Sequence, residues 1–190
     1  EVYFKIFDEN GNTQSSDIPI FGDGSTDKYE YPDIAYDNSS SDRVHVVAWN
    51  TDENKIRYKG ATDFGDESSD WGSAFDFSPP SGYIYRLPHV SAQGDRVLIT
   101  WEKVKSDYSE VYQRFAYSKN GGISSSNFTE GGFGTQYWRP IPVLTNTSTK
   151  WYMVKWGQSG SYCYVYYNYT TDPDSGSSSW RKVSISDQGY

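Results

Sequence analysis

Three apolar segments recur along the chain at a nearly constant spacing, and this recurrence restricts the fold more than any other feature. They read VHVVAWN, VLITWEK and YMVKWGQ, at Val44–Asn50, Val97–Lys103 and Tyr152–Gln158. Aligned on their tryptophans, Trp49, Trp101 and Trp156, they lie 52 and 55 residues apart. A period of this length predicts one supersecondary unit that is stacked several times.

A second marker shares this period. A proline followed within two positions by a β-branched residue precedes each segment, in YPDIAYD at Pro32, LPHVSAQ at Pro88 and IPVLTNT at Pro142. Each segment is apolar at odd and even positions alike, and successive side chains of a strand point to opposite faces. A strand that is apolar on both faces belongs between two sheets, which favours stacked sheets over a helical solenoid.

The rest of the unit also repeats. A third strand of aromatic and aliphatic residues follows in KIRYKGAT, EVYQRFAYS and YCYVYYNYT, which start at Lys55, Glu110 and Tyr162. Each then reaches a turn with an acidic or amide residue two positions before glycine, at Asp63, Asn120 and Asp174. A fourth strand should follow, opened by Trp71 and Trp180 in two units and by Phe128 in the middle one.

The amino terminus fits the same frame, because EVYFKIFDENGN and SDIPIFG match a third and a fourth strand. We therefore predict an all-β fold, a β-propeller segment of about three and a half repeats with four-stranded antiparallel blades. The expected units are a half blade over 1–28 and blades over about 29–82, 83–136 and 137–190. Starting in mid-blade predicts further repeats before Glu1 in a larger parent chain. We expect the tryptophans to fill the gaps between blades, with ligand stacking as the alternative.

Composition narrows the function. The chain has 190 residues, with 18 Tyr, 9 Phe and 7 Trp, a net charge of -8 and a pI near 4.7. This charge disfavours nucleic acid and anionic membranes as partners. No apolar stretch approaches the roughly 20 residues of a membrane-spanning helix. Cys163 is the only cysteine, so no internal disulfide is expected.

The unit resembles the repeats of sialidase-type β-propellers, whose turns carry the Asp-box, in outline Ser/Thr-x-Asp-x-Gly-x-x-Trp. The middle turn keeps Ser118, Asn120 and Gly122, while the others keep Asp63, Gly65 and Trp71, and Asp174, Gly176 and Trp180. The resemblance covers nearly the whole chain, with degenerate boxes. It implies that the boxes are structural, brace turns and lie away from the catalytic face.

The segment Tyr85-Arg86-Leu87-Pro88 is similar to the Tyr/Phe-Arg-Ile-Pro motif of sialidases, in which the arginine grips a substrate carboxylate. In the next unit Arg139 lies near the equivalent place beside Trp138, and the first unit carries Glu30 there. The candidate ligand-binding residues are therefore Tyr85, Arg86, Trp138 and Arg139. The alternative is that Arg86 only precedes a repeat proline. No catalytic residue is assigned, because nothing selects a trio among 18 tyrosines and 25 acidic residues.

Metal and cofactor signals are weak. Only His45 and His89 could join Cys163 in a zinc site. The runs DENGN, with Asp8, and DPDSG, with Asp172 and Asp174, space oxygen ligands as calcium prefers, but they lack the bidentate glutamate of an EF-hand. We expect braced turns and no cofactor. Four Asn-x-Ser/Thr sequons, at Asn38, Asn127, Asn146 and Asn168, favour a secreted or cell-surface glycoprotein.

Three functional hypotheses follow from these observations. The first is a non-catalytic extracellular propeller module that binds glycans or neighbouring surface proteins. The second is a sialidase-type glycoside hydrolase. The third is a structural subunit of a surface layer or filament, in which the chain forms a homo-oligomer through exposed strand edges.

Overall fold

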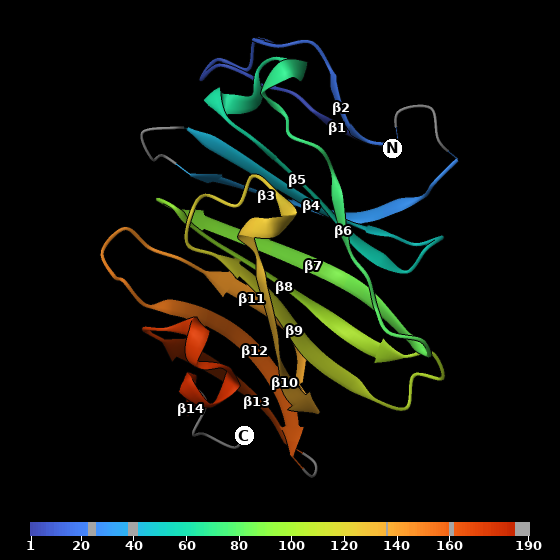
Figure 1. Ribbon diagram of the computed structural model, residues 1–190, viewed down its shortest axis with the longest axis vertical. Coiled ribbons are helices and arrows are strands. Elements are labelled where there is room, and N and C mark those ends of the chain that lie inside the picture. The colour runs from blue at the N-terminus through green and yellow to red at the C-terminus, as the bar shows by residue number, and fades with distance from the viewer. Residues whose placement is uncertain (23–25, 38–41, 136, 160–161, 185–190) are drawn as a thin grey trace.

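The computed structural model describes residues 1–22, 26–37, 42–135, 137–159 and 162–184. These residues form four antiparallel sheets, one of two strands and three of four strands. The sheets lie one on another along the long axis of the molecule, from β1–β2 at one end to β11–β14 at the other (Figure 1). The chain is thus a segment of a β-propeller, built of four-stranded blades after a two-stranded half blade.

Strands pair in chain order within every sheet. The half blade holds β1 (Val2–Phe4) and β2 (Ile18–Phe21). The first blade holds β3 (Tyr29–Asp37), β4 (Arg43–Asn50), β5 (Lys55–Ala61) and β6 (Phe75–Phe77), and the second holds β7 (Tyr83–Gln93), β8 (Arg96–Lys105), β9 (Val111–Ser118) and β10 (Thr129–Thr135). The third holds β11 (Tyr137–Val143), β12 (Trp151–Ser159), β13 (Tyr162–Thr170) and β14 (Arg181–Ser184).

Short 3-10 turns lie between the third and fourth strands of the blades. They are η1 (Asp63–Gly65), η2 (Ser68–Asp70), η3 (Ser125–Asn127), η4 (Pro173–Ser175) and η5 (Ser177–Ser179). Among the residues that the structure describes, no helix is long and apolar enough to cross a membrane.

Three apolar cores hold the stack together, one at each junction between neighbouring sheets. The largest joins the first and second blades and includes Val47, Tyr58 and Phe77 on one side and Ile99 and Trp101 on the other. Apolar side chains on both faces of β4 and β8 explain the stack, because each sheet must be covered twice. The structure therefore confirms that these two strands, which are apolar on both faces, lie between sheets.

The strand register corrects the tryptophan alignment. Trp49, Glu102 and Trp156 occupy equivalent positions, opposite Glu30, Arg86 and Trp138 of the first strands. Trp101 lies one residue earlier, and a shift of one residue turns a side chain to the other face of its sheet. Trp101 is fully buried between the first two blades, whereas Trp156 is 37% exposed.

The proline marker of the third blade is also corrected. The first strands lose register between Glu30 and Asp33, between Arg86 and His89, and between Trp138 and Ile141. Each bulge holds a left-handed residue directly before proline, namely Tyr31 (φ 51°), Leu87 (φ 51°) and Arg139 (φ 48°). The repeat proline is therefore Pro140, not Pro142.

The turn after the third strand shows a similar shift in the third blade. Ala61, Ser118 and Thr170 are equivalent, since they pair with Val44, Val97 and Trp151. Two positions further on stand Asp63, Asn120 and Asp172, so Asp172 takes the place expected for Asp174. Its backbone N–H donates to Thr170 Oγ1 at 3.1 Å, as that of Asn120 does to Ser118 Oγ at 3.3 Å.

Candidate functional site

The three bulges lie at the edge where the first strands of the blades approach one another, and they line a pocket there. β3 and β11 both contact β7 along this edge. The pocket has a volume of about 380 Å³ and is lined by Tyr31, Trp49, Arg86, Glu102, Arg139 and Trp156, with Leu87 beside them. We call it the inner pocket. Bulges are common beside binding sites because they redirect side chains.

A buried carboxylate fixes the floor of the inner pocket. Glu102 is 1% exposed, and its Oε2 accepts a hydrogen bond from Arg86 Nε at 2.9 Å. Its Oε1 accepts from the backbone N–H of Arg139 at 2.9 Å. A buried charge needs such partners, because losing water without them is costly. Glu102 thereby neutralises Arg86 and ties the second blade to the third.

The remaining lining offers aromatic faces and one exposed cation. The ring of Tyr31 stacks on Trp49 with centroids 6.2 Å apart, and Tyr31 is 55% exposed. Trp156 presents part of its indole from the third blade. The Arg139 side chain is exposed and makes no ion pair with the part of the chain that the structure describes. Flat rings beside hydrogen-bond donors suit a ring-shaped polar ligand.

The structure brings together two of the four predicted ligand residues. Arg86 and Arg139 both line the inner pocket. Tyr85 does not, because it is 3% exposed in the core beside Trp101. Trp138 lies in β11 opposite Trp156, and its side chain falls outside the described part of the structure. Sequence reasoning missed Tyr31 and Glu102, whose only signal was their place beside a repeat proline or tryptophan.

A smaller pocket of about 150 Å³ adjoins the inner pocket and shares Tyr31 and Leu87 with it. There Asp33 Oδ2 accepts from the Val90 N–H at 3.0 Å and lies 3.3 Å from His89 Nδ1. Burial acts to raise the pKa of Asp33, but the hydrogen bonds from His89 and Val90 outweigh it and lower the pKa. Asp33 links the first blade to the second as Glu102 links the second to the third.

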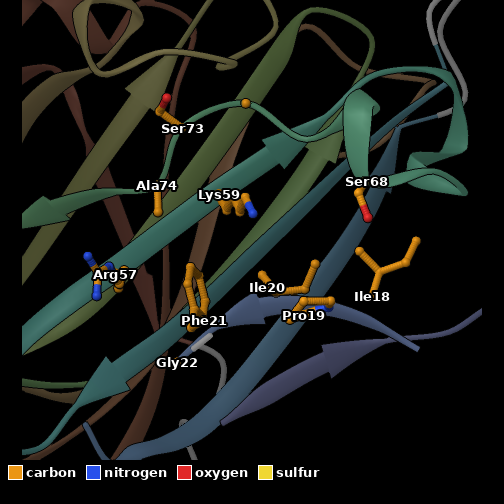
Figure 2. Close-up of a pocket in the computed structure, with 11 residues that line it drawn as sticks. Ile18, Pro19, Ile20, Phe21, Gly22, Arg57, Lys59, Ser68, Ser73 and Ala74 are labelled. Atoms are coloured by element: carbon orange, nitrogen blue, oxygen red, sulfur yellow. The ribbon is translucent and has the colours of Figure 1, made fainter. Parts of the chain in front are cut away.

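A larger pocket of about 520 Å³ lies at the outer side of the stack, between β2 and β5 (Figure 2). Arg57 and Lys59 project into it from β5, opposite Ile18, Ile20 and Phe21 of β2. Arg57 is already engaged, since Nε lies 3.3 Å from Asp76 and a terminal nitrogen donates to Tyr29 Oη at 2.6 Å. Phe21 is buried, so this pocket offers no open aromatic face.

The acidic turns brace the backbone with their carboxylates. Asp8 accepts from the backbone N–H groups of Asn10 and Asn12 at 2.9 and 2.8 Å, and these hydrogen bonds, with that from the Asn12 side chain, lower its pKa. Asp172 accepts from the Asp174 N–H at 3.2 Å and from Ser175 Oγ at 2.7 Å. Within the described ranges no three His, Cys, Asp or Glu side chains gather as a metal site.

The four sequons differ in accessibility. Asn146 is exposed, and Asn38 lies outside the described residues. The Asn127 side chain accepts from the Ser124 N–H at 3.0 Å and closes the η3 turn. Asn168 is 4% exposed within β13. A glycan on Asn168 has no room in the folded sheet, so Asn146 is the most accessible acceptor among the described sequons.

No protein-family model matches the sequence, and no curated protein matches it. Solved structures match in fold. A Penicillium chrysogenum alpha-L-arabinanase complexed with arabinobiose has a TM-score of 0.53 at 14% identity, covering 85% of this chain and 50% of that chain. A Bombyx mori GH32 beta-fructofuranosidase has a TM-score of 0.50 at 14% identity, covering 83% and 35%.

A Trypanosoma rangeli sialidase in complex with sialic acid also matches, with a TM-score of 0.32 at 11% identity, over 95% of this chain and 40% of that chain. That likeness is too weak to bear on the sialidase-type repeat. The chain spans half or less of the length of these three proteins. The two better matches show the β-propeller fold, the class to which this chain belongs, and nothing finer.

Proposed function

We propose that the chain is a glycan-binding β-propeller module of a secreted or cell-surface protein, and that the inner pocket holds the sugar. The observation that carries this proposal is the pairing of two partly exposed aromatic rings, Tyr31 at 55% and Trp156 at 37%, with the exposed guanidinium of Arg139. Rings stack on the apolar face of a sugar while the arginine donates to its hydroxyl or carboxylate oxygens. The matched arabinanase and fructofuranosidase, named for sugar substrates, support the same ligand class.

Binding without catalysis is favoured by the carboxylates of the pocket. Most glycoside hydrolases need a pair of carboxyl groups flanking the scissile bond. Among the described residues that line the inner pocket, Glu102 is the single carboxylate, and both its oxygens are hydrogen-bonded to Arg86 and Arg139. A carboxylate held in this way fixes the shape of the pocket and is poorly placed to act as a general acid or base.

Binding to immobilised glycans, followed by titration calorimetry on the best ligand, tests the proposal. Trp156→Ala and Arg139→Ala should each weaken binding at least about tenfold, a loss of about 1.4 kcal/mol. Phe7→Ala is the control, because Phe7 is an aromatic residue that is 56% exposed and does not line the pocket. Equal affinity of wild type and both pocket variants would rule out this site.

The second candidate is a sialidase-type hydrolase, favoured by the meeting of Arg86 and Arg139 in one pocket. A fluorogenic sialoside assay on the wild-type chain addresses it directly. Turnover that disappears in Arg86→Ala would overturn the non-catalytic proposal. We expect no turnover, with glycan binding retained.

A further inference from the structure

Most of the large exposed apolar residues in the described part of the chain lie at the two ends of the stack, the exceptions being Phe7, Tyr31 and Tyr108. At the half-blade end they are Tyr3, Ile34, Tyr36 and Phe64, which we call the front face. At the third-blade end they are Ile141, Val143, Trp156 and Val165, which we call the rear face. Exposed apolar surface that gathers on one face of a protein marks an interaction site.

Equivalent positions show that the rear face has the chemistry of a covered blade surface. Ile56 and Gln113 pair with Trp49 and Glu102, as Val165 pairs with Trp156. Ile56 and Gln113 are 0% exposed because the next blade covers them, whereas Val165 is 41% exposed. Val165 therefore occupies a position that a neighbouring blade covers elsewhere in the stack, so the rear face fits the side of another blade.

The front face corresponds to the other surface of a blade, the one that the preceding blade covers. Ile34 and Val90 are equivalent, since they pair with Val46 and Ile99. Val90 is 7% exposed beneath the first blade, but Ile34 is 52% exposed because β1 and β2 cover only part of its sheet. An apolar groove of about 240 Å³ opens there between β1 and β3 and is lined by Tyr3 and Ile34.

The two faces belong to halves of the chain that differ in net charge. Residues 1–82 contain 17 acidic and 6 basic side chains, and residues 83–190 contain 8 acidic and 11 basic ones. Beside the front face, η1 and η2 carry Asp63, Asp66 and Asp70, and burial together with Asp70 raises the pKa of Asp66. The strands of the third blade contain the exposed Arg139, Arg181 and Lys182 and no acidic residue, while Lys155 is buried against Phe133 of the second blade.

We propose that the rear face of one chain docks on the front face of a second copy, in a head-to-tail arrangement that continues the stack of blades. Apolar contact between the two faces supplies the affinity, and the opposite charges of the two halves orient the encounter. Such a heterologous interface repeats, so it builds closed rings or open chains. This inference does not rest on glycan binding.

Sedimentation velocity of the full 190-residue chain over a range of concentrations tests it. Wild type should shift from monomer to larger species, and less so in high salt, where the screening length falls from about 10 Å at 0.1 M to about 3 Å at 1 M. Ile34→Asp and Val165→Asp each place an unpaired carboxylate in the interface and should raise the dissociation constant at least about tenfold. Tyr108→Asn is the control, because Tyr108 is 63% exposed on neither face and its φ of 59° suits asparagine.

Mixing the two aspartate variants separates this arrangement from a symmetric one. The Ile34→Asp chain keeps an intact rear face and the Val165→Asp chain keeps an intact front face, so a 1:1 mixture should form dimers that grow no further. A wild type that stays monomeric at low salt and high concentration would overturn the proposal. So would self-association of Ile34→Asp alone at wild-type strength, and circular dichroism of both variants checks that each remains folded.

Discussion

His45 shows how a single buried side chain sets the pH response. It is 0% exposed in β4, and its Nδ1 lies 2.6 Å from Tyr58 Oη, which itself donates to the Gly122 carbonyl at 2.6 Å. Since the phenol proton is used on Gly122, the imidazole must donate from Nδ1, and burial disfavours a second proton on Nε2. Burial, assisted by the charge of Arg43, lowers the pKa of His45 to about 3.

We predict a loss of stability between pH 6.5 and 5 that depends on His45. The unfolded chain takes up a proton on this residue near pH 6.5, while the folded chain does not until about pH 3. Unfolding is therefore favoured as pH falls, by about 1.4 kcal/mol per pH unit below the unfolded pKa. Urea unfolding at several pH values should show this slope in wild type and a flatter one in His45→Gln. Val47→Ala should lower stability equally at each pH, and an unchanged slope in His45→Gln would refute the assignment.

At the scale of the strand, periodicity predicted which segments lie between sheets but not which face each residue takes. The apolar runs over β4, β8 and β12 are strands, and their period placed the blades. Register depends on pairing across the sheet, and Val44 lies five residues before Trp49 while Val97 lies four before Trp101. Residue type alone therefore aligned tryptophans that face opposite ways.

The inner pocket was half predictable for the same reason. The similarity to a sialidase motif identified Arg86, and its neighbour in the next unit identified Arg139. Glu102 carried no signal beyond its place after a repeat tryptophan, because its role arises only when Arg86 and the Arg139 backbone meet it from two strands. Tyr31 projects into the pocket owing to a bulge, and a bulge is a property of pairing rather than of composition.

Register predicts different costs for two tryptophan substitutions. Trp101→Ala should lower the free energy of unfolding by about 3–5 kcal/mol, because it empties a fully buried site between two blades. Trp156→Ala should cost less than about 1.5 kcal/mol, since that side chain is 37% exposed and surface changes are usually mild. Urea unfolding at low protein concentration measures both values. Equal losses in the free energy of unfolding would instead support the alignment on tryptophans, in which Trp101 and Trp156 are equivalent.

At the scale of the whole molecule, the blades differ in how far neighbouring sheets cover them, because the second blade lies between two others and the third lies at one end (Figure 1). The second blade lies between the first and the third, and Val97, Ile99 and Trp101 of β8 are all 0% exposed. The third blade packs one face on the second blade, and its rear face is partly exposed, with Val165 of β13 at 41%. Local opening therefore disrupts fewer contacts in β13 than in β8.

Amide hydrogen exchange should reveal this gradient. In dilute solution we expect amides of β8 to exchange at least about 100-fold more slowly than those of β13, which corresponds to an opening free energy larger by about 2.7 kcal/mol. Raising the protein concentration should slow exchange in β13 and leave β8 unchanged, because head-to-tail docking covers the rear and front faces, whereas β8 is already covered on both sides. Val165→Asp should abolish that concentration dependence without altering β8. Exchange in β13 that already matches β8 in dilute solution would contradict an open rear face, and with it the basis for docking.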